Sequence, residues 1–279
     1  MKGEALGNDY LVVDAADLSA PMTPALAVAL CDRHRGAGSD GVLLVDLRGG
    51  DVVVRILNPD GSEAEKSGNG LRILAAYLHG RGVVGDEPFR VRLVKDTVTM
   101  RVEERLPAGA LMVRVDIGRA TFRGDAVGFR PQAGETLGFA LPLGDGDSAE
   151  VTTVSLSNPH CVVFVPALER ADFLRRAPQL CTHRAFAEGT NVQFARVAAP
   201  GVLEAWIWER GAGETLASGS SACAVAAAAV RRGLAEPGPF TVAMPGGNVH
   251  VAVSPEYDVV LRGPARMVYE GRFLPGPVG

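Results

Sequence analysis

A repeat with a spacing of 151 residues runs through this chain of 279 residues. Ser67 is followed by GNG and the segment LRILAAYLHGRG, and Ser218 is followed by GSS and the segment ACAVAAAAVRRG. Shared glycine and serine content explains single matches but not a constant spacing, so the repeat predicts two homologous halves. The other pairs in this register are Gly82 with Gly233, Glu63 with Glu214, Gly38-Ser39-Asp40 with Gly189-Thr190-Asn191 and, at a spacing of 150, Asn8 with Asn158.

Each copy of the repeat reads as a strand, a polar glycine-rich turn and a helix. In the first half, the strand at 55–57 leads into a turn at 58–61, and in the second half 203–208 leads into 209–213. The serine that follows each turn can act as the helix N-cap. The second helix, 222–230, is apolar all round, which is typical of a helix buried on every side. We therefore expect each half to be a curved sheet wrapped around one central helix.

The remaining sequence is rich in alternating apolar and polar residues, which is the pattern of half-buried strands. It predicts strands at 88–94, 98–104, 111–117, 241–244 and 249–254. The tail MVYEGRF predicts one more strand, which returns to the first half, and the domain junction is expected near Gly118. The predicted fold class is α+β, with two pseudo-symmetric domains whose sheets are mostly antiparallel. One domain is expected at 1–117 plus 267–279, and the other at 118–266.

The composition limits the partners of the chain. A net charge of −4 at pH 7 predicts neither a nucleic-acid partner nor binding to anionic lipid. The start, MKGEA, lacks the apolar segment of a signal peptide, and the longest apolar run is too short to span a bilayer. The sequence therefore predicts a cytoplasmic protein. Its four cysteines form no CxxC pair, so we expect neither disulfides nor a metal site.

Two helix N-termini of the same kind suggest a site that the halves share. A helix N-terminus presents free backbone N–H groups and the positive end of the helix dipole, which suits an α-carboxylate. If two such termini face each other, the residue at each one flanks one face of the bound α-carbon. That arrangement suits the removal of the α-proton by one group and the delivery of a proton by the other.

Several long motifs resemble those of the diaminopimelate epimerase family and together cover nearly the whole chain. They are LGNDYLVVD at 6–14, CDRHRGAGSDGVLLV at 31–45, NPDGSEAEKSGNG at 58–70, SNPHCVV at 157–163, EGTNVQF at 188–194, WERGAGETLASGSSACA at 208–224 and MPGG at 244–247. The resemblance implies two similar domains with the site between them, a homodimer and no cofactor. It also implies the conversion of LL- to meso-diaminopimelate in lysine and peptidoglycan biosynthesis.

In the family, a pair of cysteines occupies the positions of Ser67 and Ser218. A thiol has a pKa of about 8.5, lower at a helix N-terminus, so it can serve as base and as acid near neutral pH. A serine hydroxyl is a much weaker acid and needs an adjacent activating group. The resemblance implies that His160 and Glu209 support these two positions, which completes the predicted catalytic set. Lys66, beside Ser67, is more simply interpreted as a solvated turn residue.

The resemblance also implies a substrate-binding set on this chain. An asparagine is an ordinary turn residue, whereas an arginine between a strand and a glycine turn suits carboxylate recognition. The expected side-chain contacts are Asn8, Asn58, Asn158, Asn191 and Arg210, and the expected backbone N–H donors are those of Gly68, Asn69, Gly219 and Ser220.

Three explanations of the paired serines stay open. The chain is an engineered trap in which both cysteines were replaced, a divergent racemase or isomerase of another amino acid, or a catalytically silent amino-acid-binding homologue. The polar set argues against the third explanation, because a scaffold has no reason to keep it. We predict a cofactor-independent epimerase of the diaminopimelate epimerase type that is very slow or inactive because it lacks the thiols.

Overall fold

The computed structural model describes residues 1–132, 134–144 and 146–274, and it divides into two compact units. Unit 1 comprises 1–113 and the chain from 264 onward, and unit 2 comprises 114–263. Both boundaries fall within strands, β8 (Leu111–Arg119) and β17 (Asp258–Tyr269), a few residues before the junctions expected from the sequence. The last positions of the expected first domain, 275–279, lie outside the described residues.

Unit 1 is a mixed sheet with two helices. β2 pairs with β1 antiparallel and with β3 parallel, and β4 pairs with β3 and β5 antiparallel and with β6 parallel. β7 closes the series antiparallel to β6, and the end of β17 pairs with β1. The elements are β1 (Lys2–Ala5), β2 (Asn8–Asp14), α1 (Pro24–Cys31), β3 (Val42–Asp46), β4 (Val52–Leu57), β5 (Glu63–Ala64), α2 (Gly68–Gly80), β6 (Phe89–Arg92) and β7 (Thr97–Arg105), with 3₁₀ turns at Ala15–Asp17 and Pro107–Gly109.

Unit 2 repeats this order of pairings. β11 pairs with β10 antiparallel and with β12 parallel, and β13 pairs with β12 and β14 antiparallel and with β15 parallel. β16 then follows antiparallel to β15, so the structure confirms the repeat. The elements are the 3₁₀ turn Asp125–Val127, β9 (Phe139–Gly144), β10 (Asp147–Ser155), β11 (Pro159–Phe164), α3 (Arg170–Cys181), β12 (Asn191–Ala199), β13 (Val202–Glu209), β14 (Gly213–Thr215), α4 (Gly219–Arg231), β15 (Gly238–Met244) and β16 (Gly247–Val253).

The strand register corrects one of the pairs inferred from the sequence. Leu11 pairs with Val42 in unit 1, and Cys161 pairs with Val192 in unit 2, so both strands keep a spacing of 150 here. Asn191, which precedes Val192, therefore corresponds to Gly41 and not to Asp40. Unit 1 carries one extra residue in the loop before β3, which the comparison of short Gly-rich motifs could not resolve.

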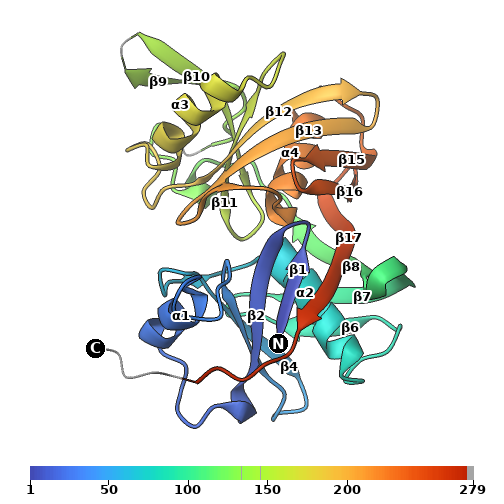
Figure 1. The fold of residues 1–279 in the computed structure, drawn as a ribbon. Helices are drawn as coiled ribbons and strands as arrows, with labels where there is room; N and C mark the ends of the chain where they lie inside the picture. Colours follow the sequence, from blue (N-terminus) through green and yellow to red (C-terminus); the bar gives the residue numbers. More distant parts are fainter. Residues whose placement is uncertain (133, 145, 275–279) are drawn as a thin grey trace. The chain divides into compact units, whose positions relative to one another are not determined.

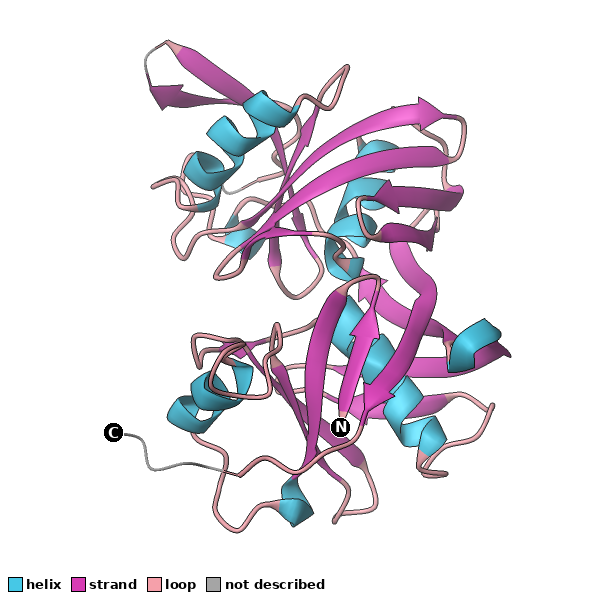
Figure 2. Ribbon diagram, in the orientation of Figure 1, coloured by secondary structure: helices cyan, strands magenta, loops and turns pink. Residues whose placement is uncertain are grey.

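The central helices α2 and α4 have the same length, 13 residues, and the same place in their units (Figures 1 and 2). α2 packs against β1, β2 and β7, and α4 packs against the strands from β10 to β13 and against β15 and β16. The α4 residues from Gly219 to Val230 are all buried, as expected for a helix that is apolar on every side. This confirms the predicted curved sheet around a central helix.

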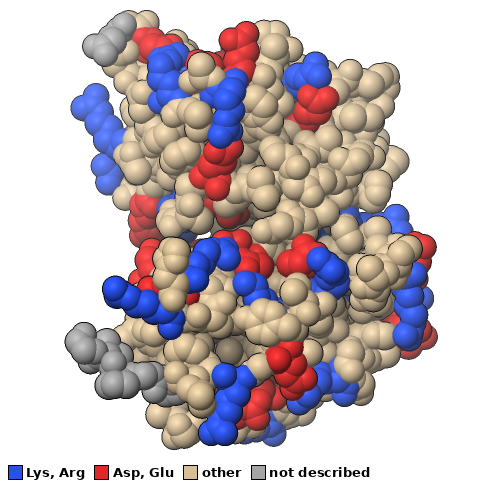
Figure 3. Space-filling model, in the orientation of Figure 1, with Lys and Arg blue, Asp and Glu red and all other residues tan. Residues whose placement is uncertain are grey.

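The returning tail differs from its prediction. Met267 and its neighbours do not form a strand of their own, because they are the end of β17, which begins at Asp258 and ends at Tyr269. Within the described residues, no helix is long and apolar enough to cross a membrane. On the face drawn in Figure 3, basic and acidic side chains are interspersed. Exposed ion pairs such as Arg48–Asp46 are part of this pattern along the chain.

Candidate functional site

Ser67 and Ser218 occupy the same local structure. Each is the N-cap of its central helix, with φ and ψ of −136° and 115° at Ser67 and of −143° and 121° at Ser218. In both units the serine carbonyl accepts the first intrahelical hydrogen bond, from Leu71 N at 2.9 Å and from Ala222 N at 3.0 Å. The helices therefore present both serines at their N-terminal ends, where the dipole favours negative charge.

The two hydroxyl groups have different surroundings. Ser67 Oγ accepts a hydrogen bond from Gly70 N at 3.0 Å and another from the phenol of Tyr10 at 3.2 Å. Ser218 is buried, and its side chain makes no capping hydrogen bond to the first turn of α4. The first serine oxygen is thus held by two donors, whereas the second is not fixed by its own helix.

In unit 1, a series of hydrogen-bonded side chains runs from the loop before β3 to the first turns of α2. Asn8 Nδ2 donates to Asp40 Oδ2 at 2.8 Å, and Asn69 Nδ2 donates to Asn8 Oδ1 at 3.0 Å. Arg72 Nη2 donates in turn to Asn69 Oδ1 at 2.8 Å. Both ends of the Asn8 amide are therefore fixed, so its orientation is set by its neighbours.

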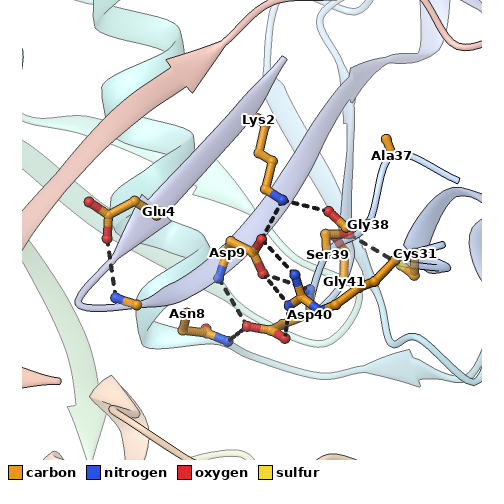
Figure 4. A network of polar contacts seen from close by, with 12 residues as sticks. Lys2, Glu4, Asn8, Asp9, Cys31, Ala37, Gly38, Ser39, Asp40 and Gly41 are labelled. Carbon is orange, nitrogen blue, oxygen red and sulfur yellow. Dashed lines mark hydrogen bonds and ion pairs between the residues drawn. The ribbon is translucent and has the colours of Figure 1, made fainter. Parts of the chain in front are cut away.

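At Asp40, this series of hydrogen-bonded side chains joins a cluster of charged groups (Figure 4). Arg33 donates to both Asp9 and Asp40, and Lys2 Nζ lies 2.5 Å from Asp9 Oδ2. Burial by itself would raise the pKa of Asp9, but the hydrogen bonds from Arg33 and Lys2 outweigh it and lower that pKa to about 2. Burial raises the pKa of Asp40, and the charge of Asp9 adds to the rise.

In unit 2, the equivalent asparagine, Asn158, belongs to a buried network of hydrogen-bonded side chains. His160 Nε2 lies 2.9 Å from Asn158 Oδ1, and Gln193 Nε2 lies 3.1 Å from His160 Nδ1. Gln193 Nε2 also donates to Ser221 Oγ at 2.9 Å, and Asn158 Nδ2 donates to Ser220 Oγ at 3.4 Å. Because an amide NH₂ only donates, His160 carries its proton on Nε2 and donates it to Asn158.

His160 is electrically neutral in this environment. Its side chain is completely buried, and burial, assisted by the charge of Arg210, lowers the pKa of His160 to about 3. Both ring nitrogens are hydrogen-bonded, to Asn158 and to Gln193. His160 therefore contacts Asn158, a predicted substrate-binding residue, and its neutral imidazole orients the Asn158 amide.

The remaining predicted side chains lie at the ends of strands. Asn191 Oδ1 accepts from Arg210 N at 3.0 Å, and Arg210 Nη1 donates to the Glu188 carbonyl at 3.2 Å, so these neighbours order one another. Asn58 follows the last residue of β4 and donates from Nδ2 to Ser62 Oγ at 2.9 Å, which makes it part of its own turn. Glu209 ends β13 at the equivalent position of unit 2.

The backbone donors predicted from the resemblance lie in the first turns of the two central helices. All four residues, Gly68, Asn69, Gly219 and Ser220, are buried. Lys66 is buried as well, and its ammonium group lies 2.5 Å from Asp96 Oδ2. The interpretation of Lys66 as a solvated turn lysine was therefore wrong, because Asp96 supplies a countercharge that no sequence neighbour reveals.

Among the residues whose side chains contact the predicted set, sequence reasoning missed Tyr10, Asp40, Arg72 and Gln193. The signal for Tyr10 was present, because the spacing that pairs Asn8 with Asn158 also pairs Tyr10 with His160. The four cysteines are buried, and none of them forms a disulfide within the part of the chain that the structure describes. Among the described residues, no group of three or more His, Cys, Asp or Glu side chains is placed to hold a metal ion.

Comparison with known proteins identifies the family. The family model described as diaminopimelate epimerase matches residues 1–123 and 152–268. The chain belongs to the diaminopimelate epimerase family. The diaminopimelate epimerase of Pelotomaculum thermopropionicum is 39% identical over 277 residues, covering 98% of this chain and 97% of that protein. That of Synechococcus sp. (strain JA-3-3Ab) is 40% identical over 278 residues, covering 97% and 96%. The family is one of isomerases.

Solved structures support the fold. A hydroxyproline epimerase from Agrobacterium vitis, with bound trans-4-hydroxy-L-proline, matches with a TM-score of 0.71 at 14% identity and covers 100% of this chain and 93% of its own. A predicted epimerase from Pseudomonas aeruginosa matches with a TM-score of 0.68 at 19% identity and covers 99% and 98%. At these identities the likeness shows the two-domain α+β fold.

Proposed function

We propose that this chain is a cofactor-independent amino-acid epimerase of the diaminopimelate epimerase type, slowed by serine at both proton-transferring positions. The observation that carries the proposal is the equivalent placement of Ser67 and Ser218, each as the N-cap of a 13-residue central helix in one of two units with the same topology. Inversion at an α-carbon needs one group that removes a proton and another that delivers one. Two equivalent helix N-termini provide the two groups.

The slow rate follows from the acidity of the serine hydroxyl. Each pKa unit by which an acid–base group is mismatched costs about 1.4 kcal/mol of proton-transfer free energy. A thiol ordinarily has a pKa of about 8.5, and an aliphatic hydroxyl is a far weaker acid. Inversion requires both faces to work, and Ser218 lacks even a capping hydrogen bond. We therefore expect full inversion to be very slow.

In this proposal, the two first turns hold the α-carboxylate of the amino acid. Backbone N–H groups at a helix N-terminus suit a carboxylate because they are donors at the positive end of the dipole. The donors are those of Gly68, Asn69, Gly219 and Ser220, and the polar side chains that hold the rest of the substrate are Asn8, Asn58, Asn158, Asn191 and Arg210. Glu209 and His160 complete the catalytic set as supports of the two serine positions, and the homodimer expected from the resemblance stays a prediction.

The experiment is the exchange of the α-hydrogen of diaminopimelate in deuterated water, followed by NMR together with chiral analysis. We compare the unsubstituted chain with the Ser67→Cys/Ser218→Cys double variant. The double variant should invert the substrate several orders of magnitude faster, because each face then carries a group with a suitable pKa. Each single replacement should help less, since both faces are needed for inversion.

A matched control is Ser19→Cys, which adds a thiol at an exposed serine of unit 1 that lies outside the turns and helices around Ser67 and Ser218. It should leave the rate unchanged. Rapid inversion by the unsubstituted chain would refute the proposed impairment. If the double-cysteine variant neither exchanges nor inverts diaminopimelate, the substrate is another amino acid, and the chain is a divergent racemase or a silent binding protein.

A further inference from the structure

We propose that Tyr10 and Ser67 act together as an acid–base pair. In this pair, the phenol oxygen of Tyr10 accepts the hydroxyl proton of Ser67 while Ser67 Oγ takes a proton from the α-carbon of the substrate. The inference rests on the proposed function and assigns different capabilities to the two serines. Tyr10 acts through Ser67 and is a positioning and proton-holding residue. The observation behind it is the hydrogen bond of 3.2 Å between the phenol and Ser67 Oγ.

The fold builds this contact from several directions. Tyr10 lies on β2, and its side chain is buried with 7% of its surface exposed. A Cβ atom added to Gly41 would lie 2.6 Å from Tyr10 Cε1 and 2.7 Å from the Leu57 carbonyl oxygen. Gly41 therefore leaves the space that the ring occupies, and a larger residue there could not avoid the Leu57 backbone.

The same site stabilises the negative charge that develops on Ser67 Oγ while its proton passes to the phenolate. The Ser67 oxygen receives a hydrogen bond from Gly70 N at 3.0 Å in addition to the contact with Tyr10, and it lies at the N-terminus of α2. Hydrogen bonds to a charged form favour that form, and the helix dipole acts in the same direction. Serine becomes useful for proton transfer when an adjacent group activates it in this way.

In unit 2, a histidine takes the place of Tyr10. The residue that corresponds to Tyr10 at the spacing of 150 is His160, whose two nitrogens are hydrogen-bonded to Asn158 and Gln193. Ser218 itself makes no capping hydrogen bond through its side chain. The two helix N-termini are therefore equivalent in backbone structure but differ in the group that assists the hydroxyl.

The proton transfer is balanced as follows. A phenol is a much stronger acid than an aliphatic hydroxyl. The step begins when the phenol of Tyr10, which donates to Ser67 Oγ in the structure, has passed its proton to water, so that the phenolate oxygen accepts the hydrogen bond instead. Ser67 Oγ then takes the proton of the Cα–H bond while its own proton passes to the phenolate oxygen, and the electron pair of that bond stays on the α-carbon. The reverse transfers return a proton to the same face.

This step predicts exchange without inversion. A proton that returns from Ser67 reaches the face it left, and it is replaced by deuterium when the phenol has exchanged with deuterated water. Inversion would need Ser218 to donate on the other face. The unsubstituted chain should therefore incorporate deuterium into one α-configuration of the substrate, retain that configuration, and leave the other configuration almost unlabelled.

The test compares Tyr10→Phe with Tyr77→Phe in the unsubstituted chain and in the Ser67→Cys background. Tyr77 is a matched control because it lies in the same unit on α2 and is similarly buried, with 5% exposed. In the Ser67 chain, Tyr10→Phe should lower single-face exchange by about a hundredfold, the scale of general acid–base assistance, with an unchanged KM. In the Ser67→Cys chain it should change exchange by less than about threefold, because a thiol does not need the phenol.

Each other outcome has a definite meaning. An equal loss in both backgrounds would show that Tyr10 only supports the structure, and no loss in the Ser67 chain would show that the phenol takes no part; either result overturns the inference. Exchange by the Ser67→Cys chain but none by the unsubstituted chain overturns it as well, while the proposed function stands. If no variant exchanges the α-hydrogen of any amino acid, the proposed function fails, and the inference about Tyr10 and Ser67 fails with it.

Discussion

Asn8 and Asn158 occupy equivalent positions in the two units but are anchored in opposite senses. Asn8 turns its carbonyl oxygen toward the central helix, where Asn69 Nδ2 donates to it at 3.0 Å. Asn158 turns its NH₂ group toward the central helix, where Ser220 Oγ accepts it at 3.4 Å. The opposite amide ends are held by Asp40 and by His160. The repeat therefore preserves the residue but not the polarity of its hydrogen bonds.

This polarity predicts different costs for the same substitution. Asn8→Asp places a carboxylate oxygen beside Asp40 Oδ2, where the amide now donates at 2.8 Å, so two negative charges meet. Asn158→Asp keeps the oxygen that His160 contacts and presents a second oxygen to the Ser220 hydroxyl, which can donate. Asn8→Asp should cost about 1–3 kcal/mol more unfolding free energy at pH 7, measured in urea. Equal costs would mean that the two amides are not oriented as described.

The symmetric framework could be predicted from the sequence because it rests on local signals. Serine followed by glycine before an apolar helix is an N-cap pattern, and it occurs twice, at Ser67 and Ser218. The all-apolar segment of α4 predicted a helix buried on every side. The tail was placed less well, since alternation alone did not show that β17 begins at Asp258 and pairs with strands of both units.

The polar networks could not be predicted, because long-range contacts create them. Arg72 sits in the segment LRILAAYL and is completely buried, where its Nε donates to the carbonyl of Pro264, 192 residues further along the chain. Gln193 reads as a polar residue of a half-buried strand, yet it bridges His160 and Ser221 in the interior. Such partners depend on which elements the fold brings together, and a single sequence carries no record of that.

The buried network around Arg72 predicts a large penalty for a conservative change. Its guanidinium donates to the carbonyls of Gly68 and Pro264 and to Asn69 Oδ1. Lysine has a compact ammonium group and cannot reproduce this fork. Arg72→Lys should cost on the order of 3 kcal/mol of unfolding free energy, because buried acceptors lose their donors. Arg48→Lys, at a side chain that is 67% exposed, should cost within about 0.5 kcal/mol, and a similar loss in both would contradict the prediction.

His160 predicts how stability depends on pH. Its pKa is about 3 in the folded chain and about 6.5 in an unfolded chain, so only the unfolded state takes up a proton between these values. The contribution is complete above pH 6.5 and is lost as the pH falls toward 3, by about 1.4 kcal/mol per pH unit. The lowered pKa of Asp9, about 2, also reduces the unfolding free energy as the pH falls, but only below about pH 4. The raised pKa of Asp40 has the opposite effect, because it increases the unfolding free energy as the pH falls.

Comparing variants isolates the contribution of His160. His160→Gln removes the titrating group, so its unfolding free energy should fall less steeply between pH 6.5 and pH 4.5 than that of the parent, by about 1.4 kcal/mol per unit. The exposed His34→Gln serves as the control and should keep the parental slope. Urea unfolding at several pH values measures both. Parallel profiles for His160→Gln and the parent would show that the buried imidazole does not resist protonation.

Arg210 carries the prediction about substrate selectivity. The Glu188 carbonyl and the Asn191 side chain hold this residue at the end of β13, and a guanidinium fork matches the two oxygens of a carboxylate. If Arg210 binds the distal carboxylate of diaminopimelate, Arg210→Ala should weaken binding by roughly 10- to 100-fold, the effect of losing a charged hydrogen bond. Lysine lacks that distal carboxylate, so its binding should change little.

Calorimetry of both ligands with the same variants separates recognition from general damage. Arg210→Lys keeps the charge but loses the planar fork, so its affinity for diaminopimelate should lie between those of the parent and Arg210→Ala. Arg184→Ala removes an exposed arginine from the same loop region and should bind like the parent. An equal loss for diaminopimelate and lysine would mean that Arg210 maintains the loop through Asn191. Unchanged affinity for diaminopimelate would remove Arg210 from the binding site, and the distal group of the substrate would then have to be sought elsewhere.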